Sequence, residues 1–452
     1  MTNKIIHPPI DQNMLEFKLP SAVVKRFENG LTLIHFHRSD IPKVYFRLGI
    51  LGGEKMDFSE AAGSVDLMSG MMKKGTKTRT YHEFAEAVDY TGGSLGASAS
   101  RDFFYGQGGF LSEFAGDGLG LMADMFRNPV FPEEQLVRDR DRSIADLENE
   151  KSSSGYIGRK FMTQQLYSPH PYGLSATAET LSSVTAETLS KLHARTIGPK
   201  NAFLVITGDI VFEKAAQLAE DMFGDWEEQQ GASMDFPKLQ YAPDVLLVDR
   251  PGSVQSSVSF GVPLFSRTDE RYIRTRLCNQ ILGGGSSGRL FLTLREEKGL
   301  TYGAYSSMDV YLEAGGWISS AEVRGEATGE AIDGFMDEFD KIRSEEVSAD
   351  ELKSAKRYIA GAFPMRCETP AGMANLFLLQ SLYGFPENYW NNYLDEIESV
   401  TAADVLQSAT EFLRDDKMQI VVVGDAATVL PQLGRYQDIR VVDVDGNEKQ
   451  AG

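Results

Sequence analysis

The chain has 452 residues, of which 42% are hydrophobic and 24% are charged, and its formal net charge is −20 at pH 7. This length is too great for one ordinary domain, and the apolar content is sufficient for more than one hydrophobic core. The negative charge argues against binding to nucleic acid or to anionic membranes, and it suits a soluble protein whose charged ligands are basic.

Cysteine content and the N-terminal sequence bear on the compartment. The two cysteines, Cys278 and Cys367, cannot form a disulfide framework, which fits a reducing environment. The N-terminal stretch lacks the apolar centre of a signal peptide, and no run of 18 apolar residues occurs in the chain. We therefore expect a cytoplasmic protein, or a periplasmic one if this chain is a processed form.

Strands and helices alternate in the first half of the chain. Two β-like runs flank Asn29-Gly30 within residues 23–36, which is typical of a β-hairpin, and residues 44–49 are predicted to form a further strand. Residues 92–105 alternate like a pair of strands, and residues 202–207 are an apolar strand that ends at Gly208-Asp209. Apolar periodicity predicts helices at residues 60–73, 81–90, 111–128, 133–151, 158–166 and 176–197.

A long-range repeat organises the chain. Ser183-Val184-Thr185-Ala186 recurs as Ser399-Val400-Thr401-Ala402, and the strand before Gly208-Asp209 recurs as residues 418–423 before Gly424-Asp425. Both matches have the same offset of 216 residues, which chance matches would not share. Each repeat has about 210 residues, far more than one unit of a solenoid. The sequence therefore predicts two homologous domains.

We expect an α+β fold in each domain, with a mostly antiparallel sheet and helices packed on one face. The linker is assigned to Glu227–Pro243 because that stretch has few apolar residues. The predicted organisation is an N-terminal extension at residues 1–21, a first domain at 22–226, a linker at 227–243, a second domain at 244–440 and a polar tail at 441–452.

The most informative stretch is Leu282–Ser307, a glycine-rich loop followed by an apolar run and a charged segment. Gly299 is predicted to end a short helix, and a strand is predicted to start after it. This places Arg295 near the end of the helix and Tyr302 at the start of the strand, so that both can point at one cleft. A guanidinium beside a phenol can stabilise a developing oxyanion. The alternatives are an ordinary salt bridge for Arg295 and a packed strand aromatic for Tyr302.

Two other interpretations of these glycines are disfavoured. Gly283-x-Gly285-x-x-Gly288 fits a dinucleotide-binding fingerprint, but that fingerprint follows a strand, and residues 271–282 are predicted to be helical. Gly284-x-Ser286-x-Gly288 fits a nucleophile elbow, whose histidine comes after the serine. The last histidine of this chain is His193, so the triad cannot be completed in that order.

Together with the duplication, the sequence LGGGSSGRLFLTLREEKGLTYGAYSS resembles the pitrilysin/insulinase family of metallopeptidases, in its short, processing-peptidase-like branch. Further family features recur at Gly52-Gly53-Glu54, Lys74-Gly75-Thr76 and His170-Pro171-Tyr172-Gly173, so the resemblance covers nearly the whole chain. It implies one half of a clam-shell chamber that two such chains form. It also implies cleavage of peptides by a zinc-bound water.

The zinc motif of that family, His-x-x-Glu-His on a helix shortly before Lys-Gly-Thr, is missing here. Its three positions hold Asp66, Ser69 and Gly70, and the distal carboxylate ligand falls near Asp146. Such a site needs two imidazoles on one helix face and a carboxylate base. No two histidines of this chain are four residues apart, so we expect that this chain binds no metal.

The resemblance also identifies groups that could act on a substrate. Family enzymes direct the residues at the positions of Arg295 and Tyr302 toward the substrate carbonyl and its tetrahedral intermediate. Their first half offers a sheet edge to which the peptide adds as a strand. The matching stretch here is Gly96-Ala97-Ser98-Ala99, in which Gly96 replaces an asparagine that is common in the family.

We therefore expect a zinc-less subunit of a heterodimeric peptidase. A paralogous partner subunit would bring the zinc motif and the zinc, and this chain would contribute Arg295 and Tyr302 to the hydrolysis of an unstructured peptide. One alternative is a non-catalytic structural or binding subunit, like the core proteins of the respiratory cytochrome complex that descend from this family. A second alternative is a stand-alone peptidase with a rebuilt metal site. Neither nucleic acid nor a membrane is expected as a partner.

Overall fold

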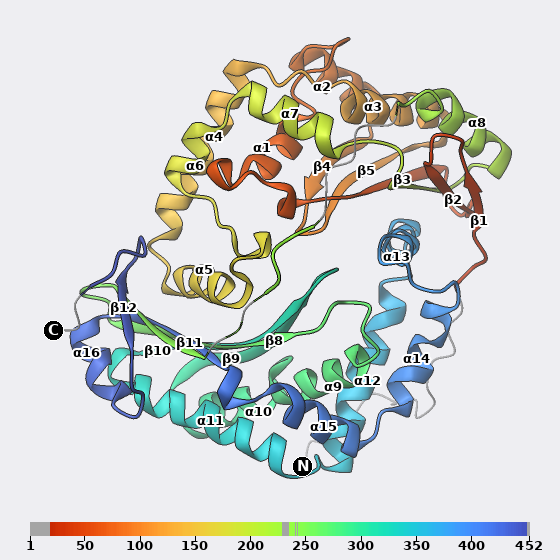
Figure 1. The fold of residues 1–452 in the computed structure, drawn as a ribbon. Helices are drawn as coiled ribbons and strands as arrows, with labels where there is room; N and C mark the ends of the chain where they lie inside the picture. The colour runs from red at the N-terminus through yellow and green to blue at the C-terminus, as the bar shows by residue number, and fades with distance from the viewer. Residues whose placement is uncertain (1–18, 228–234, 240, 242, 450–452) are drawn as a thin grey trace, which may run out of the picture.

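The computed structural model describes residues 19–227, 235–239, 241 and 243–449. These residues form two six-stranded mixed sheets that face each other, with helices on their outer faces (Figure 1). The strands of the first sheet are β1 (Val23–Arg26), β2 (Thr32–His37), β3 (Lys43–Leu51), β4 (Ser94–Ala99), β5 (Phe103–Leu111) and β6 (Ala202–Gly208). The strands of the second sheet are β7 (Asp244–Asp249), β8 (Gln255–Leu264), β9 (Thr301–Val310), β10 (Gly315–Arg324), β11 (Gln419–Gly424) and β12 (Arg440–Asp443).

Helices make up most of the remaining described chain. Those of the first half are α1 (Ser64–Met71), α2 (Tyr81–Tyr90), α3 (Ala115–Arg127), α4 (Glu133–Glu150), α5 (Ser154–Tyr167), α6 (Ala178–Ser183), α7 (Ala186–Thr196) and α8 (Phe212–Phe223). Those of the second half are α9 (Tyr272–Gly283), α10 (Arg289–Phe291), α11 (Thr328–Ser344), α12 (Ala349–Met365), α13 (Pro370–Leu382), α14 (Tyr389–Ser399), α15 (Ala402–Phe412) and α16 (Ala426–Val429). None of these described helices has the length and apolar character needed to cross a bilayer.

The first sheet starts with the predicted hairpin. β1 pairs antiparallel with β2, and the loop between them contains Gly30 at a φ of 95°, a conformation that favours glycine. β2 runs parallel to β6, and β6 runs antiparallel to β3. β3 pairs with β5 and β5 with β4, so β1 and β4 are the two edge strands of this sheet.

The second sheet repeats the pairing from β2 to β4, but its outermost pair differs, because β12 runs parallel to β7 whereas β1 is antiparallel to β2. β7 runs parallel to β11, and β11, β8, β10 and β9 follow in antiparallel order, so β12 and β9 are the two edge strands. The repeated Ser-Val-Thr-Ala sequences also have one role. Thr185 and Thr401 are the N-caps of α7 and α15, and each side chain accepts a hydrogen bond from the backbone N–H three residues later. The structure confirms the α+β class and the duplication.

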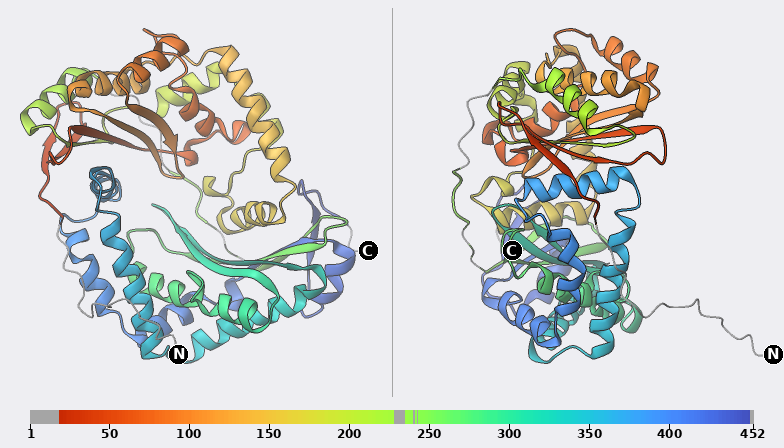
Figure 2. Two further views of the ribbon diagram at one scale, coloured as in Figure 1. Left: turned by 180° about the vertical axis from the view of Figure 1, so that it is seen from behind. Right: turned by 90° about the vertical axis from the view of Figure 1, so that its right-hand side faces the viewer.

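Each half places one helix on the sheet of the other half (Figure 2). α5 of the first half packs on β8 and β11, and α13 of the second half packs on β3 and β6. Two glycines make room for these helices. A side chain on Gly49 of β3 would clash with Leu378 of α13, and a side chain on Gly261 of β8 would clash with Met162 of α5. In addition to the predicted helical layer, each sheet therefore carries a helix on its opposite face.

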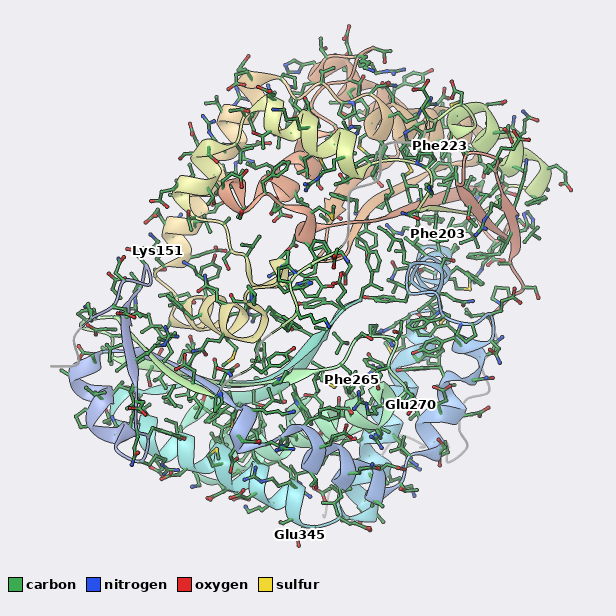
Figure 3. The ribbon with its side chains drawn as sticks, viewed as in Figure 1. Lys151, Phe203, Phe223, Phe265, Glu270 and Glu345 are labelled. Atoms are coloured by element: carbon green, nitrogen blue, oxygen red, sulfur yellow. The ribbon has the colours of Figure 1, made fainter. Side chains whose placement is uncertain are left out.

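This helix exchange joins the hydrophobic cores of the two halves. Phe36 and Val205 of the first sheet belong to the same buried cluster as residues of the second half. Met162 and Leu166 of α5 form a cluster with strand residues of the second sheet. Phe203 of β6 lies beside α13 (Figure 3) and packs against the core of the second half. A second buried cluster, which runs from Phe27 to Trp226, contains residues of the first half alone.

Several element boundaries differ from the sequence prediction. The predicted helix at residues 176–197 is two helices, because Val184 and Thr185 are extended and Thr185 caps the second one. The helix predicted from residue 111 begins only at Ala115, since β5 continues to Leu111. The helix predicted at residues 60–73 is confined to α1.

The predicted ends of the domains are placed differently by the structure. β12 includes residues 441–443 and pairs in parallel with β7, so the second sheet continues into the stretch that we expected to be a polar tail. Its consecutive residues Val441 and Val442 are both buried, and a boundary assigned from composition does not detect so short an apolar segment. Residues 1–18 of the expected extension and most of the expected linker lie outside the described residues.

Candidate functional site

The glycine-rich stretch of the second half forms a helix-to-strand turn. Leu292–Glu297 adopt a π-helix, a form that often occurs at functional sites. Gly299 ends it with a φ of 64°, as its predicted role as a C-cap requires. The backbone N–H groups of Gly299 and Leu300 donate to the carbonyl oxygens of Arg295 and Leu294, at 3.1 and 2.9 Å. Arg295 therefore lies near the helix end and Tyr302 at the start of β9.

The side chains of Arg295 and Tyr302 are both exposed. The Arg295 guanidinium lies 4.7 Å from the centroid of the Phe291 ring, and its Nε is 3.4 Å from the Glu296 carboxylate. An exposed ion pair of this length contributes little to stability. Tyr302 is 89% exposed and has no hydrogen-bond partner among the described residues, so it is not a packed strand aromatic. No hydrogen bond joins the two side chains in this part of the chain.

Tyr302 lines a cavity of about 990 Å³ between α5 and the strands β8, β9 and β10. Tyr156 and Arg159 of α5 and Tyr305 of β9 contribute to the same wall. Arg295 is not part of this wall and lies on the surface beside the Gly299 turn. The structure thus places one member of the predicted pair in the cavity and the other outside it.

The zinc-motif positions lie on α1, which runs beside β4. Asp66 faces a cavity of about 340 Å³, and Ser69 is buried with its Oγ unpaired. A methyl group at Gly70 would meet no atom within 4 Å, so a side chain is missing there although space exists for it. Asp146 on α4 is exposed and is not part of the cavity wall.

These residues do not fit a zinc ion. Zinc in proteins takes three or four imidazole, thiolate or carboxylate ligands. The α1 positions offer one carboxylate, one buried hydroxyl and no third side chain. Throughout the described residues, no three His, Cys, Asp or Glu side chains gather in a way that could hold a metal.

The cavity beside α1 has a marked effect on Asp66. Asp66 is an exposed residue whose side chain is open to the cavity. Desolvation by the surrounding protein, together with the negative charges of Glu54 and Asp57, raises the pKa of Asp66 to about 7, although Arg101 acts in the opposite direction. The position that the family uses for a metal ligand therefore holds a carboxyl group that protonates near neutral pH.

Asp57 anchors the start of α1. Its carboxylate accepts hydrogen bonds from the backbone N–H groups of Gly63 and Val65, at 2.9 and 2.8 Å, and from the Ser64 hydroxyl at 2.8 Å. Burial raises the pKa of Asp57 to about 6 even though these hydrogen bonds favour the charged form. Sequence analysis did not identify Asp57, because it lies seven residues before the first residue of α1, outside the positions that helix-capping motifs describe.

Shared walls connect the interior cavities. Tyr156 and Arg159 of α5 line both the cavity beside Asp66 and the cavity beside Tyr302. Asp309 of β9 lines the Tyr302 cavity and a third cavity of about 640 Å³ in the second half. The zinc-motif helix and Tyr302 therefore border neighbouring spaces along the inside of the molecule.

The stretch matched to the family's substrate-binding edge lies in β4. Gly96, Ala97, Ser98 and Ala99 pair on one side with β5, and among the described residues no strand pairs with the other side. The unpaired backbone groups of such an edge can take an added strand. A Cβ atom at Gly96 would come no closer than 3.9 Å to other atoms, so packing does not require glycine there.

A buried ionic network between the halves was missed by sequence reasoning. Lys55 Nζ lies 3.1 Å from the Asp102 carboxylate and 2.9 Å from the Glu313 carboxylate. His170 Nε2 is 3.0 Å from Glu313, and the Tyr172 hydroxyl donates to Asp102. Two of the family motifs noted in the sequence lie at this network, but motif recurrence alone gave them no role. The structure shows that they hold the two halves together.

Comparison with known proteins decides the family. The sequence model described as "Insulinase (Peptidase family M16)" matches residues 35–178, and the model described as "Peptidase M16 inactive domain" matches residues 183–359. The chain belongs to peptidase family M16. This confirms the resemblance seen in the sequence.

Individual relatives of this M16 chain span nearly its full length. An "Uncharacterized zinc protease" from Rickettsia bellii is 23% identical over 406 residues, covering 88% of this chain and 97% of the relative. A "Non-peptidase homolog YmxG" from Helicobacter pylori is 20% identical over 375 residues, covering 81% and 85%. The crystal structure of a peptidase M16 inactive domain from Pseudomonas fluorescens superposes with a TM-score of 0.84 at 24% identity, covering 90% of this chain and 98% of that one. This last likeness establishes the fold.

Proposed function

We propose that this M16 chain is the zinc-less subunit of a two-chain peptidase. Its partner is a paralogous chain that carries the His-x-x-Glu-His motif and the zinc, and the substrate is an unstructured peptide. This chain contributes Arg295 and Tyr302 to the shared site. The observation that carries the proposal is the exposure of both side chains, 44% for Arg295 and 89% for Tyr302.

The chemistry of the pair supports this role. When a peptide carbonyl becomes tetrahedral, its oxygen gains negative charge. The phenol O–H of Tyr302 and the guanidinium N–H groups of Arg295 can donate hydrogen bonds to that oxygen. Removing one donor of this kind lowers kcat by about 10²–10³-fold in other hydrolases. The exposed positions leave both groups able to reach a substrate held by a second chain.

Two features of the interior support a peptide as the substrate. β4 offers an unpaired edge beside α1, to which an extended peptide can add as a strand. The cavities that border α1 and Tyr302 share the walls formed by Tyr156 and Arg159, so a peptide that leaves the β4 edge can continue toward Tyr302.

A second candidate is a non-catalytic structural or binding subunit. The loss of all three zinc-motif side chains favours it, since nothing in the described chain replaces them. The name of the Helicobacter pylori relative, a non-peptidase homolog, points in the same direction for that protein. The two candidates differ in whether Arg295 and Tyr302 are used.

Co-expression with a zinc-motif paralogue from the same genome distinguishes them. Cleavage of a fluorogenic unstructured peptide would be measured for each chain alone and for the purified complex. We expect activity in the complex and none in this chain alone. Arg295→Ala and Tyr302→Phe, each introduced into this chain, are expected to lower kcat of the complex by about 10²–10³-fold.

Matched variants control for surface changes. Arg324→Ala removes another exposed arginine with a neighbouring glutamate, and Tyr90→Phe removes the hydroxyl of another exposed tyrosine. Both should leave the activity of the complex unchanged. A stable complex whose activity ignores Arg295→Ala and Tyr302→Phe would assign this chain to the structural class. Peptidase activity of this chain alone would contradict both candidates.

A further inference from the structure

The third interior cavity has a positively charged wall. This space of about 640 Å³ lies in the second half between α9, α12, α13, α14 and the end of β9. Arg267, Arg276 and Arg366 line it, and Asp309 is the one acidic residue among its described lining residues. Three cations thus meet one anion in a protein whose formal net charge is −20. A cleft whose lining has an excess of one charge raises the local concentration of ligands of the opposite charge.

The protein itself does not neutralise these arginines. Arg267 donates a hydrogen bond of 3.1 Å to the Tyr389 hydroxyl, and Arg276 donates to the Tyr393 hydroxyl. The Arg366 side chain has no hydrogen-bond or ion-pair partner among the described residues. Phenols are neutral acceptors, so all three guanidinium charges remain uncompensated by a bonded carboxylate.

Two arginines near Arg276 form ion pairs with carboxylates of the protein, which is typical of arginines with a structural role. Arg274, two residues before Arg276 on α9, lies 3.0 Å from the Glu411 carboxylate, and Arg271 lies 2.6 Å from the Asp269 carboxylate. Neither of them lines the cavity. At this helix, Arg271 and Arg274 therefore form ion pairs with carboxylates of the protein. Arg276 does not, because its hydrogen-bond partner is the Tyr393 hydroxyl.

Asp309 does not neutralise the three arginines, because its carboxyl group interacts with charged groups on the side of the neighbouring cavity. The charges that influence its carboxyl group are those of Arg159 and Arg101, which belong to the first half. Neither Arg267, Arg276 nor Arg366 forms an ion pair with it. Within the described residues, no carboxylate forms an ion pair with any of these three guanidinium groups.

Apart from Asp309 and Asn375, the rest of the described wall is mostly apolar or aromatic. Phe363, Leu376 and Trp390 are buried there, and the guanidinium carbon of Arg267 lies 3.7 Å from the centroid of the Tyr272 ring. Stacking on an aromatic ring orients the planar guanidinium, which can then bind a carboxylate through two parallel hydrogen bonds. The volume lies within the 300–1,000 Å³ range that is typical of small-molecule sites.

We propose that this cavity binds an organic carboxylate that has an apolar body. The carboxylate is held by the guanidinium groups of Arg276, Arg366 and Arg267, and the apolar body packs against the aromatic wall. A free organic acid and the C-terminal residue of a peptide share this chemistry. The site goes beyond the proposed function, because it requires neither a partner chain nor zinc.

Isothermal titration calorimetry of the purified full-length chain tests the site. N-acetyl-phenylalanine supplies the carboxylate and an aromatic body, and N-acetyl-phenylalaninamide is its uncharged match. We expect the acid to bind at least about tenfold more tightly than the amide, because hydrogen bonds to charged groups are stronger than those to neutral ones. Inorganic phosphate, which lacks an apolar body, should bind more weakly than the acid.

Substitutions locate the binding. Arg276→Gln and Arg366→Gln are each expected to weaken the binding of the acid about tenfold. Arg274→Gln on α9 and Arg357→Gln on α12 remove arginines that are not part of the wall, and they should leave the affinity unchanged. Arg366 is exposed and makes no side-chain hydrogen bond in the described structure, so its variant remains informative even if Arg276→Gln impairs folding.

Binding experiments with peptides distinguish the two possible sources of the carboxylate. A short peptide that ends in phenylalanine is compared in its free-acid and amidated forms. Tighter binding of the free-acid peptide identifies peptide C-termini as ligands, whereas binding of N-acetyl-phenylalanine alone identifies a small organic acid. Equal affinity for the acid and the amide, or an unchanged affinity in both Arg276→Gln and Arg366→Gln, would overturn the proposal.

Discussion

The Asp102 carboxylate, in the turn between β4 and β5, accepts a hydrogen bond of 2.8 Å from the backbone N–H of Leu312, in the turn between β9 and β10. The tips of the two duplicated hairpins therefore meet at one carboxylate. Lys55 lies 3.1 Å from the same group, and both of these side chains are only 2% exposed. A charged pair that is so deeply buried depends on both of its members.

Lys55→Met is expected to destabilise the protein by roughly 3–5 kcal/mol, because it leaves Asp102 as a buried charge without its cation. Urea unfolding followed by circular dichroism measures the loss. Lys25→Met is the matched control, since the pair between Lys25 and Glu220 is exposed and should contribute less than about 1 kcal/mol. A loss below about 1 kcal/mol for Lys55→Met would show that the network does not hold the halves together.

Two glycines near the degenerate zinc position should respond in opposite ways to alanine. Gly53 has a φ of 71°, and a Cβ atom there would overlap the backbone of Ser100 and Phe103, so Gly53→Ala should cost more than about 2 kcal/mol. Gly70 lies in α1 with open space around it, so Gly70→Ala should stabilise the protein by about 0.5–1 kcal/mol. Thermal melts of the two variants provide the test, and a stabilising Gly53→Ala would be incompatible with this backbone geometry.

Removal of metal should have no effect on this chain by itself. The described residues contain no group of three or more possible ligands, so dialysis against a chelator is expected to leave the melting temperature unchanged. Elemental analysis of the purified protein should find far less than one zinc ion per chain. The double variant Asp66→His with Gly70→His places two imidazoles one helical turn apart and serves as a positive control, which should gain zinc. Stoichiometric zinc in the unmodified chain would contradict the expectation.

Asp66 should make the folded state less stable as the pH rises. Its pKa is about 7 in the folded protein, above the usual value of a carboxyl group, so the folded form holds a proton that the unfolded form has lost. The stability that this proton provides is complete below about pH 4 and is lost as the pH rises through 7. Asp66→Asn should remove this dependence and be more stable at pH 8 by about 1 kcal/mol, a figure reduced for solvent in the open cavity.

Melting temperatures at pH 5 and pH 8 measure this effect. The unmodified chain should lose more stability between these values than Asp66→Asn does. Asp57 also titrates in this range, with a pKa of about 6, so part of the pH dependence will remain in the variant. An identical pH dependence in both proteins would show that Asp66 ionises as an ordinary surface carboxyl group.

Local signals in the sequence were sufficient for much of the fold. The hairpin at Asn29-Gly30 and the helix end at Gly299 depend on left-handed glycines, whose requirement is visible in a few residues. The repeat at Thr185 and Thr401 was visible because both cap a helix in the same way. These features are determined within one or two turns of chain, which is the range that sequence patterns describe.

Long-range packing was not visible in the sequence. Helical periodicity identified the helix at residues 158–166, but it gave no sign that this helix packs on the sheet of the other half. The same holds for the cavity beside α1, where Asp66, Glu54 and Asp57 meet only after folding. Motif comparison found the zinc positions and their loss, whereas the protonation of Asp66 depends on neighbours from several elements.

The crossed placement of α5 and α13 determines how the chain should respond to a cut. A protease that cleaves between α8 and β7 severs the connection between the halves, but each fragment still needs the other's helix to cover a sheet face. We therefore expect the nicked protein to stay associated and to melt in a single transition. Either fragment expressed alone would expose the apolar bed of the missing helix and aggregate. The ancestral duplication thus produced a pair of mutually dependent halves instead of two independent folding units.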